Sequence, residues 1–123
     1  MRISTIVMCT LMLAPVSLTA QTSHENKTGL PEYPNLVNRT QYEKPQQDSG
    51  HSYLMFTAET KDEVPVVEAW YRKALPKATE RPKNTSVTYG YELTNGGDKV
   101  QVYKLGQNAK GAIVELWKLV PSN

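Results

Sequence analysis

The stretch HSYLMFTAETKDEVPVVEAWYRKALP, residues 51–76, decides the fold, because the period of its apolar residues changes from two to about 3.6 along the way. Alternation over residues 51–59 predicts a strand with two distinct faces. Helical spacing over residues 62–75 predicts one amphipathic helix. We expect Asp62 to cap this helix, because Pro65 then falls in the first turn, where its missing N–H has no helical partner to lose.

Three further strands follow the helix as a meander. Residues 86–93 alternate strictly, and Asn95-Gly96-Gly97-Asp98 is a strong hairpin signal before the next strand, residues 99–105. A second turn leads to a last strand at residues 112–120. The remaining segments are interpreted from composition, as loops at residues 43–50 and 76–85 and a weaker strand at residues 35–42.

These elements predict an α+β domain, in which one helix packs on one face of a mostly antiparallel sheet of four to five strands. The chain order is a strand, preceded by a second one if residues 35–42 pair, then the helix, then three strands. We expect the apolar stripe of the helix to bury against one set of alternating strand residues. These residues are Val87, Tyr89, Tyr91, Val100, Val102, Val114 and Leu116.

The first twenty residues are typical of a secretory signal peptide. Arg2 gives a positive start, residues 6–14 form an apolar core, and mostly small residues close the segment. That core is too short to cross a membrane as a helix. We therefore expect an exported protein, periplasmic or extracellular, with a flexible lead-in at residues 21–32 and a single small domain at residues 33–123.

Composition argues against several classes of function. The one cysteine, Cys9, lies in the signal segment, so the mature chain has no thiol, and a cysteine-free exported domain fits a bacterial envelope best. A formal net charge of +2 gives no field strong enough to collect nucleic acid. Neither His24 nor His51 has a second metal ligand two to four residues later in the chain, and no Gly-x-Ser-x-Gly elbow occurs. We expect no cofactor and no enzymatic activity.

Two motifs carry a resemblance to a known domain. Residues 33–35 read Tyr-Pro-Asn, and residues 66–76 read Val-Val-Glu-Ala-Trp-Tyr-Arg-Lys-Ala-Leu-Pro after a strand and an acidic cap. Over residues 33–120 the chain resembles a small domain recurrent in exported bacterial proteins, with a "YPxA" opening, a strand, a helix and a β-meander. Leu36 stands where that domain more often has Ala. The domain is one of unknown function, so the resemblance implies a fold but no site residues.

The strand residues that point away from the helix form the first candidate surface, because one helix covers only one face of a sheet. Unless residues 33–42 fold across them, they are expected to dock an envelope protein or a second copy of the chain. This candidate partner face consists of Tyr53, Met55, Tyr103, Leu105, Ile113, Trp117 and Leu119.

A basic cluster at the end of the helix is the second candidate surface. Cations are favoured there by the helix dipole, so a solvated helix end is the simpler interpretation. The functional alternative is a binding site for an anionic envelope component, a lipid or a wall polymer. This basic cluster consists of Arg72, Lys73, Lys77, Arg81 and Lys83. Of the two surfaces, we expect the candidate partner face to carry the function.

Overall fold

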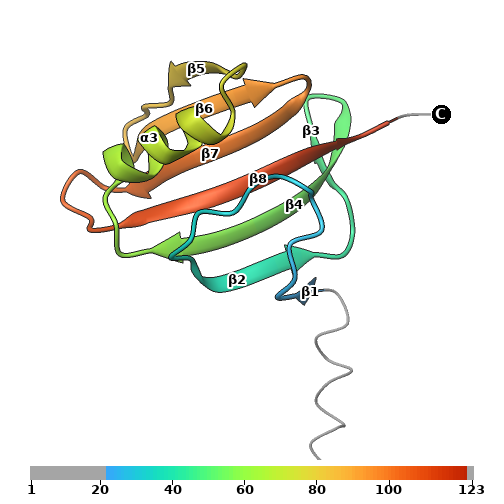
Figure 1. Ribbon diagram of the computed structural model, residues 1–123, viewed down its shortest axis with the longest axis horizontal. Coiled ribbons are helices and arrows are strands. Elements are labelled where there is room, and N and C mark those ends of the chain that lie inside the picture. Colours follow the sequence, from blue (N-terminus) through green and yellow to red (C-terminus); the bar gives the residue numbers. More distant parts are fainter. Residues whose placement is uncertain (1–21, 122–123) are drawn as a thin grey trace, which may run out of the picture.

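The computed structural model describes residues 22–121, so the expected signal peptide at residues 1–20 lies outside the described residues. The described chain forms one antiparallel sheet and one helix (Figure 1). The strands are β1 (Thr22–Ser23), β2 (Val37–Tyr42), β3 (Gln46–Asp48), β4 (His51–Thr60), β5 (Thr79–Pro82), β6 (Thr88–Asn95), β7 (Asp98–Leu105) and β8 (Ala112–Val120), and the helix is α3 (Val64–Ala74).

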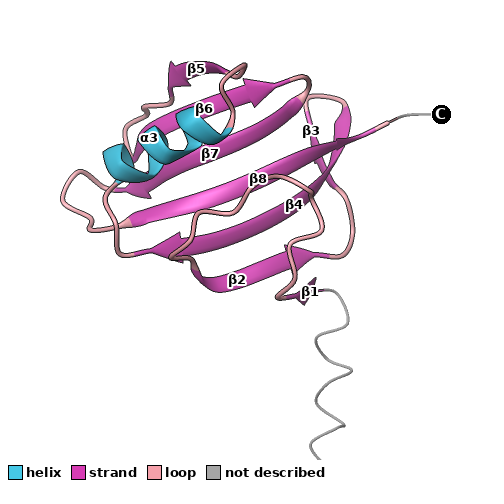
Figure 2. Cartoon of the chain, in the orientation of Figure 1, coloured by secondary structure: helices cyan, strands magenta, loops and turns pink. Residues whose placement is uncertain are grey.

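The sheet has eight strands in the order β1-β2-β4-β8-β7-β6-β5, and β3 pairs with β4 off this path. β4 and β8 pair antiparallel from Ser52↔Val120 to Thr60↔Ala112, so the strand before the helix lies beside the last strand of the meander. Figure 2 shows the strands side by side, with α3 in front of the β6–β7 half. The central β4–β8 pair therefore joins the N-terminal strands to the meander.

The expectation of an α+β domain with four to five strands is wrong, because the described residues are richer in strand: 49% strand and 11% helix. The missed strands include β3 and β5, which lie inside the segments expected to be loops. Both are short and polar, with the sequences Gln-Gln-Asp and Thr-Glu-Arg-Pro. A short strand at a sheet edge needs backbone partners but no buried side-chain face, so it lacks the apolar alternation that identifies a strand.

The helix begins slightly later than expected, and its cap is different. Glu63, not Asp62, is the N-cap residue, and its side chain makes no capping hydrogen bond. The Asp62 carboxylate instead accepts a hydrogen bond from the Tyr33 hydroxyl, and the Glu63 carboxylate accepts one from Gly111 N at 3.1 Å. Pro65 lies in the first turn, as expected. Both acids thus bind segments distant in sequence instead of capping the helix. The local sequence did not indicate these contacts.

One side of the sheet, which we call the covered face, carries α3 and an N-terminal segment, residues 24–36, which we call the strap (Figure 1). The expected apolar positions of β7 and β8 are confirmed as core, whereas Val87 is 60% exposed and precedes β6. The core joins residues from the sheet, the helix and the strap. They are Leu30, Tyr33, Phe56, Ala58, Val64, Val67, Tyr71, Leu93, Val100, Val102, Ala112, Val114 and Leu116.

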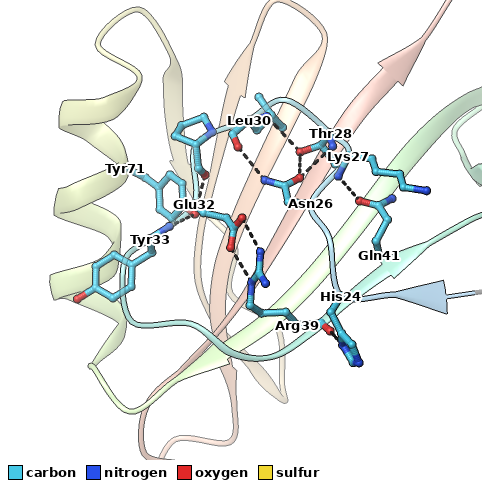
Figure 3. Close-up of polar contacts among 11 residues, drawn as sticks. His24, Asn26, Lys27, Thr28, Leu30, Glu32, Tyr33, Arg39, Gln41 and Tyr71 are labelled. Carbon is cyan, nitrogen blue, oxygen red and sulfur yellow. Dashed lines mark hydrogen bonds and ion pairs between the residues drawn. The ribbon is translucent and has the colours of Figure 1, made fainter.

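The strap packs on the sheet, where a flexible lead-in was expected at residues 21–32. Thr28 and Leu30 are buried, and Lys27 N donates to the side chain of buried Gln41 at 2.7 Å (Figure 3). The Arg39 guanidinium binds both oxygens of Glu32 at 2.8 Å. The expectation rested on polar composition, but these polar groups are paired across the strap and β2. Ordered packing therefore begins before Tyr33.

The two motifs of the sequence resemblance meet where the strap crosses α3. The hydroxyl of fully buried Tyr71 accepts a hydrogen bond from Tyr33 N and donates one to Pro31 O, each at 3.0 Å (Figure 3). The Tyr33 ring packs edge-on against Trp70, with 5.6 Å between ring centres. The motif residues Tyr33, Trp70 and Tyr71 thus fasten the strap to the helix, which is a structural role.

Candidate functional site

The side of the sheet opposite α3 and the strap, which we call the open face, is the candidate functional site. Residues 33–36 lie in the strap, and residues 37–42 form β2. The segment that could have folded across the open face therefore belongs to the covered face and to the sheet itself. Its placement leaves the open face without the helix or the strap over it.

The strand register places the whole candidate partner face on the open face. Direct cross-strand pairs are Tyr53↔Leu119, Met55↔Trp117 and Tyr103↔Ile113, and Leu105 follows Tyr103 on the same side of β7. These residues are unequally covered: Tyr53 is only 6% exposed, whereas Leu105 is 58% exposed. Tyr53 and Trp117 meet edge to face, with 5.4 Å between ring centres and 77° between ring planes.

A lysine that the sequence pattern did not single out lies between these two rings. Lys99 Nζ is 4.7 Å from the ring centre of Tyr53 and 5.0 Å from that of Trp117, which are cation–π distances. It also donates to Asp48 Oδ2 at 2.7 Å, and this hydrogen bond, followed by the charge of Lys99, holds the pKa of Asp48 below its usual value. Strict alternation along β7 would have placed Lys99 on this face.

The Lys99–Asp48 contact also shows how β3 lies relative to β7. Asp48 belongs to β3 and Lys99 to β7, and β4 and β8 lie between them in the sheet. In a flat sheet, three strand spacings would separate them by roughly 14 Å, with both side chains standing perpendicular to the sheet. Their direct contact therefore requires Lys99 to lean across β8, as its position over the Tyr53 ring on β4 shows, and β3 to lie closer to β7 than in a flat sheet. Figure 1 shows β3 at the same end of the molecule as the β6–β7 turn.

A carboxylate near the centre of the open face accepts two hydrogen bonds from aromatic side chains. Trp117 Nε1 donates to Glu115 Oε1 at 2.9 Å, and the Tyr103 hydroxyl donates to Glu115 Oε2. Burial, and then the hydrogen bond to Glu115, raise the pKa of Tyr103 above its usual value. The indole and phenol groups are thus fixed in orientation by one acceptor.

A second carboxylate, Glu92 on β6, is almost completely buried and collects several donors. Arg81 Nη2 lies at 2.8 Å, Gln101 Nε2 at 3.0 Å and Lys83 Nζ at 3.8 Å. Burial alone would raise the pKa of Glu92, but the hydrogen bonds and charges of these neighbours outweigh it, so the pKa lies below its usual value. Glu92 is therefore ionised and satisfied at neutral pH.

The basic cluster expected at the end of the helix is split by these contacts. Arg81 and Lys83 pair with Glu92, whereas Arg72 pairs with Glu68 on α3 at 2.6 Å. The cluster thus divides between the two faces of the sheet. Within residues 22–121, only the exposed Lys73 and Lys77 of this set make no ion pair.

A hollow of about 350 Å³ lies apart from the open face, between the start of α3 and β6. Its rim groups Glu63 and Asn84 accept hydrogen bonds from backbone N–H groups, of Gly111 and Gly90 respectively. Its wall is mainly apolar, and its lining residues are Glu63, Val64, Pro65, Pro82, Asn84, Tyr89, Gly90, Tyr91 and Lys104. The sequence pattern did not indicate this hollow, because the hollow depends on how α3 packs against β6.

Among residues 22–121, no group of three or more His, Cys, Asp or Glu could hold a metal ion. In the same part of the chain, no helix has the length and apolar character to span a membrane. Comparisons with protein-family models, with curated proteins and with solved structures give no match. The resemblance to a small exported bacterial domain therefore stays a prediction that rests on its sequence pattern.

Proposed function

We propose that this chain is an exported, non-enzymatic interaction module whose open face binds a protein of the cell envelope. One observation carries the proposal: α3 and the strap both lie on the covered face, and the aromatic residues of the open face have neither over them. Trp, Tyr and Arg are the residue types that most often dominate binding energy at protein interfaces. The open face presents all three.

The arrangement of the open face suits binding more than chemistry. Lys99 is held between Tyr53 and Trp117, and Glu115 holds the polar ends of Tyr103 and Trp117. Side chains that are already fixed lose little conformational freedom when a partner docks, which lowers the entropic cost of association. The polar contacts also orient a partner, because a group facing them must match their charges.

Binding of an anionic lipid or wall polymer at the basic cluster has less support. Three of its five cations are already paired with carboxylates of the same chain. A ligand would have to compete with those carboxylates or be bound by Lys73 and Lys77 alone. We therefore place the function on the open face.

The test is site-specific photocrosslinking at two matched positions, in cells that export the protein. A photoreactive amino acid at Leu105 samples the open face, and one at Val66 samples the outer side of α3. The two residues are similarly exposed, 58% and 55%, so any difference reports the surface and not general accessibility. A discrete adduct formed only from position 105 supports the proposal, and its mass separates a different protein from a second copy of the chain.

Equal adducts from both positions, or none from position 105, would overturn the proposal. The variant Trp117→Asp then checks the face itself in a purified complex with the crosslinked partner. We expect Trp117→Asp to abolish binding while circular dichroism shows a folded protein. Loss of folding would instead place Trp117 in the core of the monomer.

A further inference from the structure

Two glutamates meet where α3 lies against the edge strand β5. Glu68 on α3 has a side chain only 9% exposed, and Glu80 on β5 has one 24% exposed. Glu80 is paired with Leu93 of the core, so its side chain is on the covered face, toward the helix. Arg72 Nε lies 2.6 Å from Glu68 Oε2 and 3.8 Å from Glu80 Oε1.

The charges at this contact do not balance. The charged groups that face Glu80 are Glu68 and Arg72, both on α3, so two carboxylates share one guanidinium that is itself 57% exposed. Within residues 22–121, Glu80 Oε2 is the buried side-chain polar atom without a hydrogen-bond partner. A buried carboxylate oxygen without a donor is unfavourable. A proton on Glu80 removes one negative charge and lets the Glu80 carboxyl donate to Glu68.

We propose that Glu68 and Glu80 share a proton that holds β5 against α3, and that β5 loosens when this proton is lost at higher pH. Burial is the largest reason why the pKa of Glu80 is raised to about 7, followed by its hydrogen bond to Glu68 and the charge of Glu68. β5 is suited to a pH-dependent contact, because it is an edge strand of four residues that pairs with β6 alone.

The direction of the effect follows from linkage. The pKa of Glu80 in the folded protein is above its ordinary value of 4.5, so the folded state holds this proton more tightly than the unfolded state. The stabilisation is complete below about pH 4.5 and is lost as the pH rises through about 7. Loosening of β5 also affects the open face, because the next residue, Arg81, binds Glu92 there.

Two measurements on the purified protein test this inference without any partner. Carbon-13 NMR of the Glu80 side-chain carboxyl should give a titration midpoint near 7. Protection factors for the β5 amides, corrected for intrinsic exchange, should fall by more than about 10-fold between pH 5.5 and 8.5, since each unit of pKa shift corresponds to a tenfold change. A Glu80 midpoint near 4.5 would overturn the inference.

Variants separate proton sharing from general packing. Glu80→Gln keeps a donor facing Glu68 at every pH, so it should retain β5 protection at pH 8.5 and remove its pH dependence. Glu68→Gln should lower the titration midpoint of Glu80, and Glu59→Gln, at an exposed acid elsewhere on the sheet, should leave the β5 profile unchanged. A wild-type pH profile in Glu80→Gln contradicts the inference, and if that variant fails to fold, the Glu80 midpoint in Glu68→Gln decides.

Discussion

The two faces of this sheet cover their side chains by different means, and neighbouring residues on β8 show the contrast. Leu116 points to the covered face and is fully buried by apolar core residues beneath α3 and the strap. Trp117 points to the open face and is only partly covered, by Tyr53, Lys99 and its hydrogen bond to Glu115. A sheet face without a second layer can thus be covered by its own aromatic and charged side chains, while their outer surfaces stay available.

Truncating each of these two neighbours should give the largest difference between the faces. We expect Leu116→Ala to lower the free energy of unfolding by about 2–5 kcal/mol, because it leaves a cavity in a packed core. Trp117→Ala should cost less than Leu116→Ala, because part of the indole is already exposed and the loss comes from partial burial, one edge-to-face pair, one cation–π contact and the hydrogen bond to Glu115. Urea unfolding of both variants measures the difference. Equal losses would show that the open face is a second core.

Removing one hydroxyl should test how the strap completes the covered face. Tyr71→Phe keeps the buried ring but leaves Tyr33 N without its acceptor and Pro31 O without its donor. We expect a loss of about 1–3 kcal/mol in the free energy of unfolding, because these groups are shielded from water. Tyr89→Phe is the control, since the Tyr89 hydroxyl makes no hydrogen bond within the described residues. An equal loss in both variants would contradict the role of the strap.

Removing a cation should show how the open face depends on its polar contacts. Arg81→Gln takes the closest charged donor from buried Glu92, and we expect a loss of about 1–2 kcal/mol at pH 7. Lys118→Gln, whose partner Asp98 is more exposed than Glu92 (15% against 4%), should cost less than about 1 kcal/mol. Thermal or urea unfolding of both variants measures the contrast, and equal losses would mean that burial of Glu92 is unimportant.

The pH dependence of this contact has the opposite sign to that of Glu80. The pKa of Glu92 in the folded protein lies below its ordinary value of 4.5, so Glu92 adds stability above that pH. This stability is lost as the pH falls through the lowered pKa. Arg81→Gln should therefore reduce the amount by which the free energy of unfolding falls at acidic pH. If the free energy of unfolding falls equally at acidic pH in the variant and the wild type, Gln101 and Lys83 alone keep Glu92 ionised.

The elements that the sequence predicted are those that bury an apolar stripe. The strand at residues 112–120, the hairpin after β6 and the helix were confirmed, because their apolar residues repeat with the period of the buried face. β3 and β5 were missed because their side chains need no such repeat. The strap was missed because its order comes from contacts with Gln41 and Tyr71, which lie distant in sequence.

The candidate site was predictable in outline only. Alternation along β4, β7 and β8 groups Tyr53, Tyr103 and Trp117 on one side, and the register agrees. The same alternation includes Lys99 and Gln101, but a search for apolar side chains does not select these two residues. Their partners Asp48 and Glu92 lie on other strands, and the contact with Asp48 depends on how β3 lies relative to β7. Polar networks across strands cannot be derived from one strand's pattern.

The pair of variants with the smallest expected effect on stability tests most directly which surface binds a partner. Leu105→Ser and Val66→Ser change similarly exposed aliphatic residues, on the open face and on the outer side of α3. Each should change the free energy of unfolding by less than about 0.5 kcal/mol, because neither removes a buried contact. Only Leu105→Ser should weaken association with the partner found by crosslinking, measured by titration with the purified partner. If Leu105→Ser instead destabilises the isolated chain by about 2 kcal/mol or more, the apolar rim of the open face supports the monomer, as expected for buried contacts.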